Sequence, residues 1–115
     1  MRKEMPVRVA KQIKQLCEQI ARDFHPEKII LFGSHAYGRP GPDSDVDLLV
    51  VMPFKGRPTR QAIKIRNRLD TTMALDLIVR TPKQVSERLA MGDFFIREIT
   101  EQGRVIYEAD HNGCR

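Results

Sequence analysis

Residues 28–51 read KIILFGSHAYGRPGPDSDVDLLVV, and this stretch decides the fold. The run from Lys28 to Phe32 is short and nearly all apolar, which favours a buried strand. Gly33-Ser34 follows, and then a stretch rich in Gly, Pro, Asp and Ser that is typical of a functional loop. Asp45 to Val51 is expected to be a second strand, with its polar start beside the loop and its apolar end in the core. The centre of the predicted domain is therefore two strands and a polar loop.

The rest of the chain supplies the other elements of the domain. Apolar residues spaced by three and four predict a helix from Pro6 to Phe24, which His25-Pro26 ends because a residue before proline avoids the helical region. The elements expected after residue 51 are a helix over Pro58–Thr72, a strand over Ala74–Val79, a helical region from Thr81 toward Gln102, and a strand over Arg104–Glu108.

The boundaries of the last helical region carry clear signals. Thr81 is expected to cap its start, with proline at the first helical position and Gln84 closing a capping box. Gly92-Asp93 is expected to interrupt the region, and Gly103 suits its C-terminal cap. These signals separate the third strand from the fourth by helical structure.

The order α-β-β-α-β-α-β favours an α+β fold, a small mixed sheet with helices packed on it. It does not fix the order of the strands in the sheet. A length of 115 residues suits one hydrophobic core. We expect a single domain over residues 1–108, and residues 109–115 are expected to be a flexible polar tail.

Composition narrows the range of functions. A net charge of +5 favours contact with polyanions such as nucleoside triphosphates, nucleic acid or an acidic protein. The two cysteines, Cys17 and Cys114, make no disulfide framework, which fits a cytoplasmic protein, and Cys17 fits the buried stripe of the first helix. The N-terminus has no apolar stretch that suits a signal sequence, so neither secretion nor membrane spanning is expected.

Three carboxylates are the candidates for metal binding. Asp45 and Asp47 are two apart on a predicted strand, so their side chains leave the same face about 6.6 Å apart. Asp76 stands in an apolar strand, where an unpaired charge is costly, so it needs a cation or a place at the sheet edge. Oxygen ligands of this kind suit Mg²⁺, provided that the two strands are neighbours.

Gly33-Ser34 is the candidate phosphate-binding segment. A glycine lets the backbone approach a phosphate, and a serine hydroxyl with nearby N–H groups can bind its oxygens. A short helix after Ser34 would attract the same anion at its N-terminus. His25, His35 and His111 share no metal-binding spacing and are expected at the surface.

These residues resemble the minimal nucleotidyltransferases of the DNA polymerase beta superfamily. The family signature is Gly-Ser, ten residues and Asp-x-Asp, which Gly33-Ser34 and Asp45-Val46-Asp47 match, and the third family carboxylate matches Asp76. The resemblance covers nearly the whole chain. It implies the palm-like nucleotidyltransferase fold and catalysis by these three aspartates.

The resemblance also implies cofactors and roles. Two Mg²⁺ ions would be held by Asp45 and Asp47, with Asp76 completing the site of the ion that activates the acceptor. Ser34 would hold the terminal phosphates of the substrate, ATP by expectation. Relatives often place Arg after Gly-Ser where this chain has His35, so Arg39 is the candidate for the positive charge near the triphosphate.

The resemblance implies a protein partner. Relatives of this size commonly pair with a helical protein of the HEPN type, as the antitoxin of a toxin–antitoxin pair, and some add AMP to a partner tyrosine. Two alternatives stay open: a binding module that neutralises its partner by occlusion, and transfer to a small-molecule acceptor. Residues 55–68 hold six basic residues and no acidic one, but without interleaved aromatic residues direct nucleic-acid recognition is not favoured.

Overall fold

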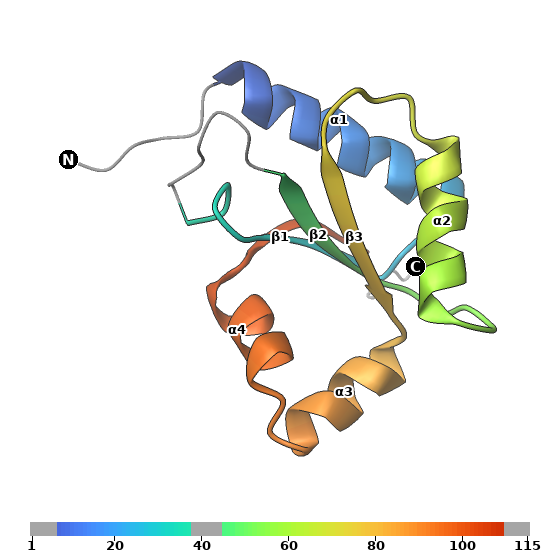
Figure 1. Cartoon of the computed structure of the whole chain (residues 1–115), viewed down its shortest axis with the longest axis vertical. Helices are drawn as coiled ribbons and strands as arrows, with labels where there is room; N and C mark the ends of the chain where they lie inside the picture. The colour runs from blue at the N-terminus through green and yellow to red at the C-terminus, as the bar shows by residue number, and fades with distance from the viewer. Residues whose placement is uncertain (1–6, 38–44, 110–115) are drawn as a thin grey trace.

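The computed structural model describes residues 7–37 and 45–109 (Figure 1). The chain has the predicted order of helices and strands, with the last helical region divided into two helices. In chain order these are α1 (Val7–Phe24), β1 (Lys28–Phe32), β2 (Val46–Val51), α2 (Pro58–Arg68), β3 (Leu75–Arg80), α3 (Pro82–Ala90), α4 (Phe94–Gln102) and β4 (Arg104–Glu108). The predicted α+β class is confirmed.

The four strands form one mixed sheet in the order β3-β2-β1-β4. β1 is antiparallel to both β2 and β4, whereas β2 and β3 are parallel. A parallel pair needs a crossover connection, and α2 supplies it between β2 and β3. The two central strands are therefore β1 and β2, the ones that flank the polar loop, and β3 is an edge strand.

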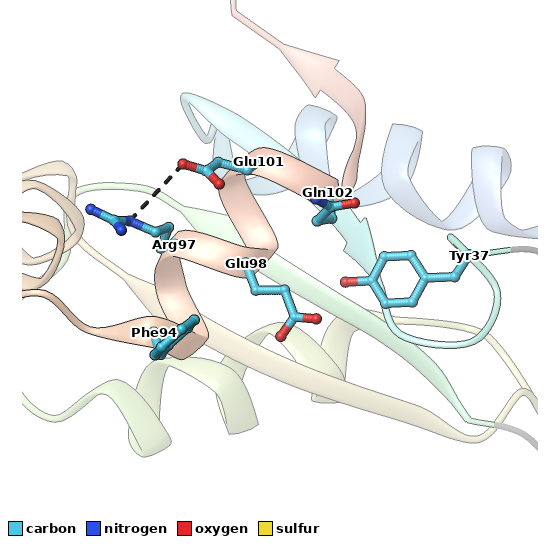
Figure 2. A pocket seen from close by; sticks show the side chains of 6 residues that line it. All are labelled: Tyr37, Phe94, Arg97, Glu98, Glu101 and Gln102. Atoms are coloured by element: carbon cyan, nitrogen blue, oxygen red, sulfur yellow. Dashed lines mark ion pairs between the residues drawn. The ribbon is translucent and has the colours of Figure 1, made fainter.

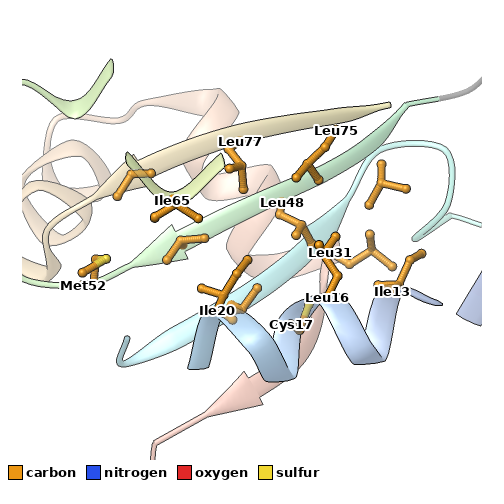
Figure 3. Close-up of a cluster of buried hydrophobic side chains, with 14 of the residues drawn as sticks. Ile13, Leu16, Cys17, Ile20, Leu31, Leu48, Met52, Ile65, Leu75 and Leu77 are labelled. Atoms are coloured by element: carbon orange, nitrogen blue, oxygen red, sulfur yellow. The ribbon is translucent and has the colours of Figure 1, made fainter. Parts of the chain in front are cut away.

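Helices cover both faces of the sheet (Figure 1). The larger core lies between the sheet and the helices α1 and α2, and Figure 3 shows the α1 side chains pointing into it. The second core lies on the opposite face and is closed by α4, with partly buried side chains of α3 beside it. Its buried members are Ile30, Phe32, Leu49, Val51, Ile96 and Ile99. Alternate residues of β1 and β2 thus serve the two cores.

The second helix ends four residues before the predicted Thr72. Leu69 is extended (φ −90°, ψ 139°), and its N–H donates to the carbonyl of Arg66 at 3.1 Å. The N–H of Met73 donates to the Thr71 hydroxyl at 3.0 Å, so local hydrogen bonds of Thr compete with the helix. The third strand accordingly begins at Leu75 rather than Ala74.

The predicted boundaries of the last helical region are confirmed. Thr81 and Gln84 form a reciprocal capping box, and the chain turns at Gly92 before Asp93 caps α4. Gly103 does cap α4, but at φ −73°, so a left-handed conformation is not the reason for glycine. A Cβ at this position would lie 2.6 Å from Ile30 Cγ2, so glycine lets the chain pack against β1.

The helices in the described ranges are all too short or too polar to cross a lipid bilayer.

Replacing a buried valine and replacing an exposed valine should lower the free energy of unfolding by different amounts. Val50 in β2 is fully buried, whereas Val105 in β4 is 48% exposed. Val50→Ala should lower the free energy of unfolding by about 2 kcal/mol, because it removes buried methyl groups and leaves a cavity. Val105→Ala, the matched control, should cost less than about 1 kcal/mol. Equal losses in urea unfolding of the two variants would contradict this picture of the core.

Candidate active site

The three candidate carboxylates come together at one end of the sheet. Asp47 in β2 is paired with Asp76 in the parallel neighbour β3, and with Phe32 in β1 on its other side. Asp45 lies two residues before Asp47, immediately before β2, so it continues the same face. The condition that β2 and β3 be neighbours, which the sequence left open, is met.

The carboxylates lie on the face of the sheet that α4 covers. Leu48 and Leu77 point into the core beneath α1, and Leu49 points into the core beneath α4. Since side chains alternate along a strand, the side chains of Asp47 and Asp76 project from the face of the sheet that α4 covers. The smaller core therefore ends at these polar side chains.

Asp76 is exposed because β3 is an edge strand. The charge of Asp76 was expected to need either a cation or a place at the sheet edge. The structure places it at the edge. The start of β3 is held by α2, since the Arg66 guanidinium donates to the carbonyl of Leu75 at 2.8 Å. This bond fixes the backbone next to Asp76.

Gly33 brings the candidate phosphate-binding turn against the carboxylates. It follows β1 with φ +78°, a conformation that L side chains avoid, and a Cβ here would overlap Oδ2 of Asp47. The N–H groups of Ala36 and Tyr37 donate to the Gly33 carbonyl at 3.0 and 3.1 Å. Residues 34–37 therefore form a single hydrogen-bonded turn, and Ser34 lies directly beside the glycine that touches Asp47.

Burial and like charge oppose ionisation at the centre of the site. Burial raises the pKa of Asp47, and the neighbouring carboxylates of Asp76 and Asp45 raise it further, while His35 acts in the opposite direction. No Lys or Arg in the described residues forms an ion pair with these aspartates. The group that would relieve the repulsion is a cation, and three carboxylates are the hard oxygen donors that Mg²⁺ takes.

The side chains do not form a preformed metal cage. Within residues 7–37 and 45–109, no three His, Cys, Asp or Glu side chains are gathered tightly enough to enclose an ion. The strand register, which is a property of the backbone, is what brings the aspartates together. The donor set therefore fits Mg²⁺ in type, and the register places Asp47 and Asp76 at the same level of neighbouring strands.

His35 was expected at the surface, and this is wrong. Its side chain is only 7% exposed because the turn after Gly33 folds back onto the sheet, and its charge lowers the pKa of Asp47. No local signal in the sequence indicates this burial, because a histidine in a polar loop is ordinarily exposed. His25 is exposed, as expected. Arg39 and His111 lie outside the described residues, so the role of Arg39 stays a prediction.

Cys17 is a core residue, as its place in the helical stripe predicted. It is buried beneath the sheet, and burial raises the pKa of its thiol to about 12. A thiol that stays protonated is a poor nucleophile. Cys17 is therefore a packing residue and not a candidate nucleophile.

Comparisons with known proteins identify the family and the fold. The family described as "Polymerase beta, Nucleotidyltransferase" matches residues 11–112. A solved structure of a candidate nucleotidyltransferase from Sulfolobus solfataricus is similar, with 19% identity and a TM-score of 0.63 over 89% of this chain and 82% of that one. A toxin–antitoxin MntA-HpeT mutant structure aligns with 21% identity and a TM-score of 0.47 over 90% of this chain and 75% of the other. No curated protein matches.

The family match spans most of the chain and includes every described residue of the candidate site, from Gly33 to Asp76. The structural likeness to the Sulfolobus solfataricus protein supports the same fold. This chain therefore belongs to the polymerase beta nucleotidyltransferase family.

Proposed function

We propose that the chain is a Mg²⁺-dependent enzyme that moves a nucleoside monophosphate, AMP from ATP by preference, onto an acceptor hydroxyl. The observation that carries this proposal is the strand register, which sets Asp47 beside Asp76 and next to the Gly33-Ser34 turn. A phosphate-binding turn and three carboxylates at one point are the two halves of a metal–triphosphate site.

Each half of the site has a distinct task. The Ser34 hydroxyl holds the terminal phosphates, which leave as pyrophosphate. Asp45 and Asp47 would hold Mg²⁺, up to two ions, and the bound metal would neutralise phosphate charge and lower the pKa of the acceptor hydroxyl. Asp76, exposed at the sheet edge, faces the acceptor side as metal ligand or proton acceptor. The acceptor oxygen attacks the α-phosphorus in line with the leaving pyrophosphate.

The acceptor in this proposal is a partner protein. Met91 and Phe95, at the corner between α3 and α4, are 78% and 50% exposed. Phe95 is on α4, which covers the carboxylate-bearing face, and Met91 directly follows α3. Large exposed apolar side chains near this face favour contact with a protein over transfer to a free small molecule. We infer that the partner is a helical protein of the HEPN type and that the chain acts as its antitoxin.

The rival function is neutralisation by occlusion, in which the chain binds its partner without catalysis. The three aspartates distinguish the two. Occlusion does not require carboxylates that repel one another and raise the pKa of Asp47, whereas metal-dependent transfer does.

Label transfer from α-labelled ATP with Mg²⁺ tests the proposal. The proteins compared are the wild type and the Asp45→Asn/Asp47→Asn double variant, with cell extract and the product of the neighbouring gene as acceptors. Label on a protein band that the double variant fails to produce establishes transfer and identifies the acceptor. If no band is labelled although the folded chain binds the neighbouring gene product, occlusion replaces transfer as the function.

A further inference from the structure

An open groove lies beside the phosphate-binding turn. Its volume is about 380 Å³, and it runs between the turn after β1 and the outer side of α4 (Figure 2). The residues that line it are Tyr37, Phe94, Arg97, Glu98, Glu101 and Gln102. None of these residues is one of the three carboxylates of the candidate site.

The groove offers two exposed rings and one carboxylate. Phe94 is 81% exposed and Tyr37 is 39% exposed, and Figure 2 shows the Glu98 carboxylate between their rings in this view. Glu101 is turned toward Arg97, to which it is ion-paired at 4.0 Å. In the described part of the chain Glu98 has no such pair. Glu98 is thus an acceptor available to a ligand that lies against the rings.

The groove is built on the same turn as the phosphate site. The Tyr37 N–H donates to the carbonyl of Gly33 at 3.1 Å, which fixes Tyr37 to the turn. At the other wall, Gln102 precedes Gly103, which packs closely against Ile30 of β1. A ligand whose phosphates lie at Gly33 therefore has the groove within the same surface.

The strand order separates the side of the site that faces the phosphates from the side that faces the acceptor. Asp76 is on β3, at one edge of the sheet, and Gly33 follows β1, two strands away. Because pyrophosphate leaves in line and opposite the acceptor, the terminal phosphates lie toward Gly33 and the acceptor toward Asp76, and the nucleoside, bonded to the α-phosphate, lies to one side of this line. The groove extends from the turn along α4, which packs on β1 and not on the β3 edge, so a nucleoside can lie in it without meeting the acceptor.

We propose that this groove binds the base of the nucleoside triphosphate, with the base against the rings of Phe94 and Tyr37 and its exocyclic amine donating to Glu98. The proposal rests on the proposed function and adds the residue that selects the base. Aromatic rings bind any base by stacking, while a glutamate accepts a hydrogen bond only from a base that presents a donor. Adenine is the occupant that agrees with ATP as substrate.

The test removes the amine from the base and the carboxylate from the protein. Binding is measured by competition with a fluorescent ribose-labelled ATP in Mg²⁺, for ATP and for purine riboside triphosphate, which is ATP without the 6-amino group. Wild type should prefer ATP by about tenfold, as expected for one hydrogen bond to a charged acceptor. In Glu98→Ala the two affinities should differ by less than about twofold. Glu87→Ala, at an exposed glutamate of α3 that does not line the groove, is the matched control and should keep the wild-type preference.

The outcomes separate the two proposals. If wild type binds neither triphosphate, the proposed function fails. If it binds both equally, or if Glu98→Ala keeps the preference for ATP, the base site in the groove is wrong while the proposed function stands. Phe94→Ala should weaken both triphosphates by a similar factor, about fivefold or more, because stacking does not depend on the amine. Glu98 and Phe94 are exposed, so circular dichroism should show each variant folded.

Discussion

Asp47→Asn is expected to reduce nucleotidyl transfer by about 10³-fold or more, the largest loss of any single substitution in this chain. Asp47 is the carboxylate that touches both halves of the site. It is paired with Asp76 across the β2–β3 ladder, and it meets Gly33 at the start of the phosphate-binding turn. Asparagine keeps the shape of the side chain but removes the charge that holds the metal. The rate of label transfer to the identified acceptor measures the loss.

The same substitution should make the metal-free protein more stable at neutral pH. The pKa of Asp47 is raised in the folded state, so ionising this carboxyl disfavours folding as pH rises above its unfolded value. The Asp47→Asn variant lacks this penalty, and its melting temperature at pH 7 should be higher than that of wild type. The difference should shrink as pH is lowered toward about 3, where the carboxyl is mostly protonated in both states.

Mg²⁺ should reverse the order of stability, because an ion that binds only the folded wild type stabilises it further as the Mg²⁺ concentration rises above the dissociation constant. Asp70→Asn is the matched control, since Asp70 is exposed after α2 and away from the site. It should leave activity, melting temperature and the response to Mg²⁺ unchanged. An Asp47→Asn variant that keeps wild-type activity would contradict the assignment of the site.

Gly33→Ala is expected to reduce transfer by at least about 10²-fold, the cost of displacing a catalytic group by about 1 Å. The added Cβ would occupy the position of Oδ2 of Asp47 and would lie 3.0 Å from its Cγ. Either the carboxylate or the turn must move, and each movement separates the phosphate-binding half of the site from the metal-binding half. Steady-state kinetics with label transfer would show a lower kcat.

Gly56→Ala separates this clash from backbone strain. Gly56 also has positive φ, at +89°, but a Cβ there meets nothing within 4 Å. Both variants should lose about 1–2 kcal/mol of stability in urea unfolding, because an L side chain is strained in this region. Only Gly33→Ala should lose activity. Equal loss of activity in both variants would show that strain alone is responsible and that the contact with Asp47 is not.

The amino-acid sequence was informative wherever the signal is local. The capping box of Thr81 and Gln84, the break at Gly92 and the strand from Lys28 to Phe32 depend on neighbouring residues, and all were predicted. The candidate site residues also rest on a local signal, the spacing of Gly33-Ser34 and Asp45-x-Asp47 along the chain. The end of α2 was wrong by four residues, since the apolar stripe continues past the point where Thr71 forms its own hydrogen bond.

The burial of His35 could not be predicted from its neighbours. A histidine in a polar loop is ordinarily exposed, and its burial results from the way the turn after Gly33 folds onto the sheet. Glu98 is a similar case. On the sequence it is one of several charged residues of an amphipathic helix, and only its position opposite Tyr37 distinguishes it.

By itself the sequence determined the class of fold, the order of its elements and the residue types that can hold a metal and a phosphate. The tertiary structure alone decided that β3 is the parallel neighbour of β2 and that Asp76 therefore lies beside Asp47. The physical reason is the range of the interactions. Hydrogen bonds within a helix, a cap or a turn join residues a few positions apart, whereas strand order depends on how all the helices cover both faces of the sheet at once.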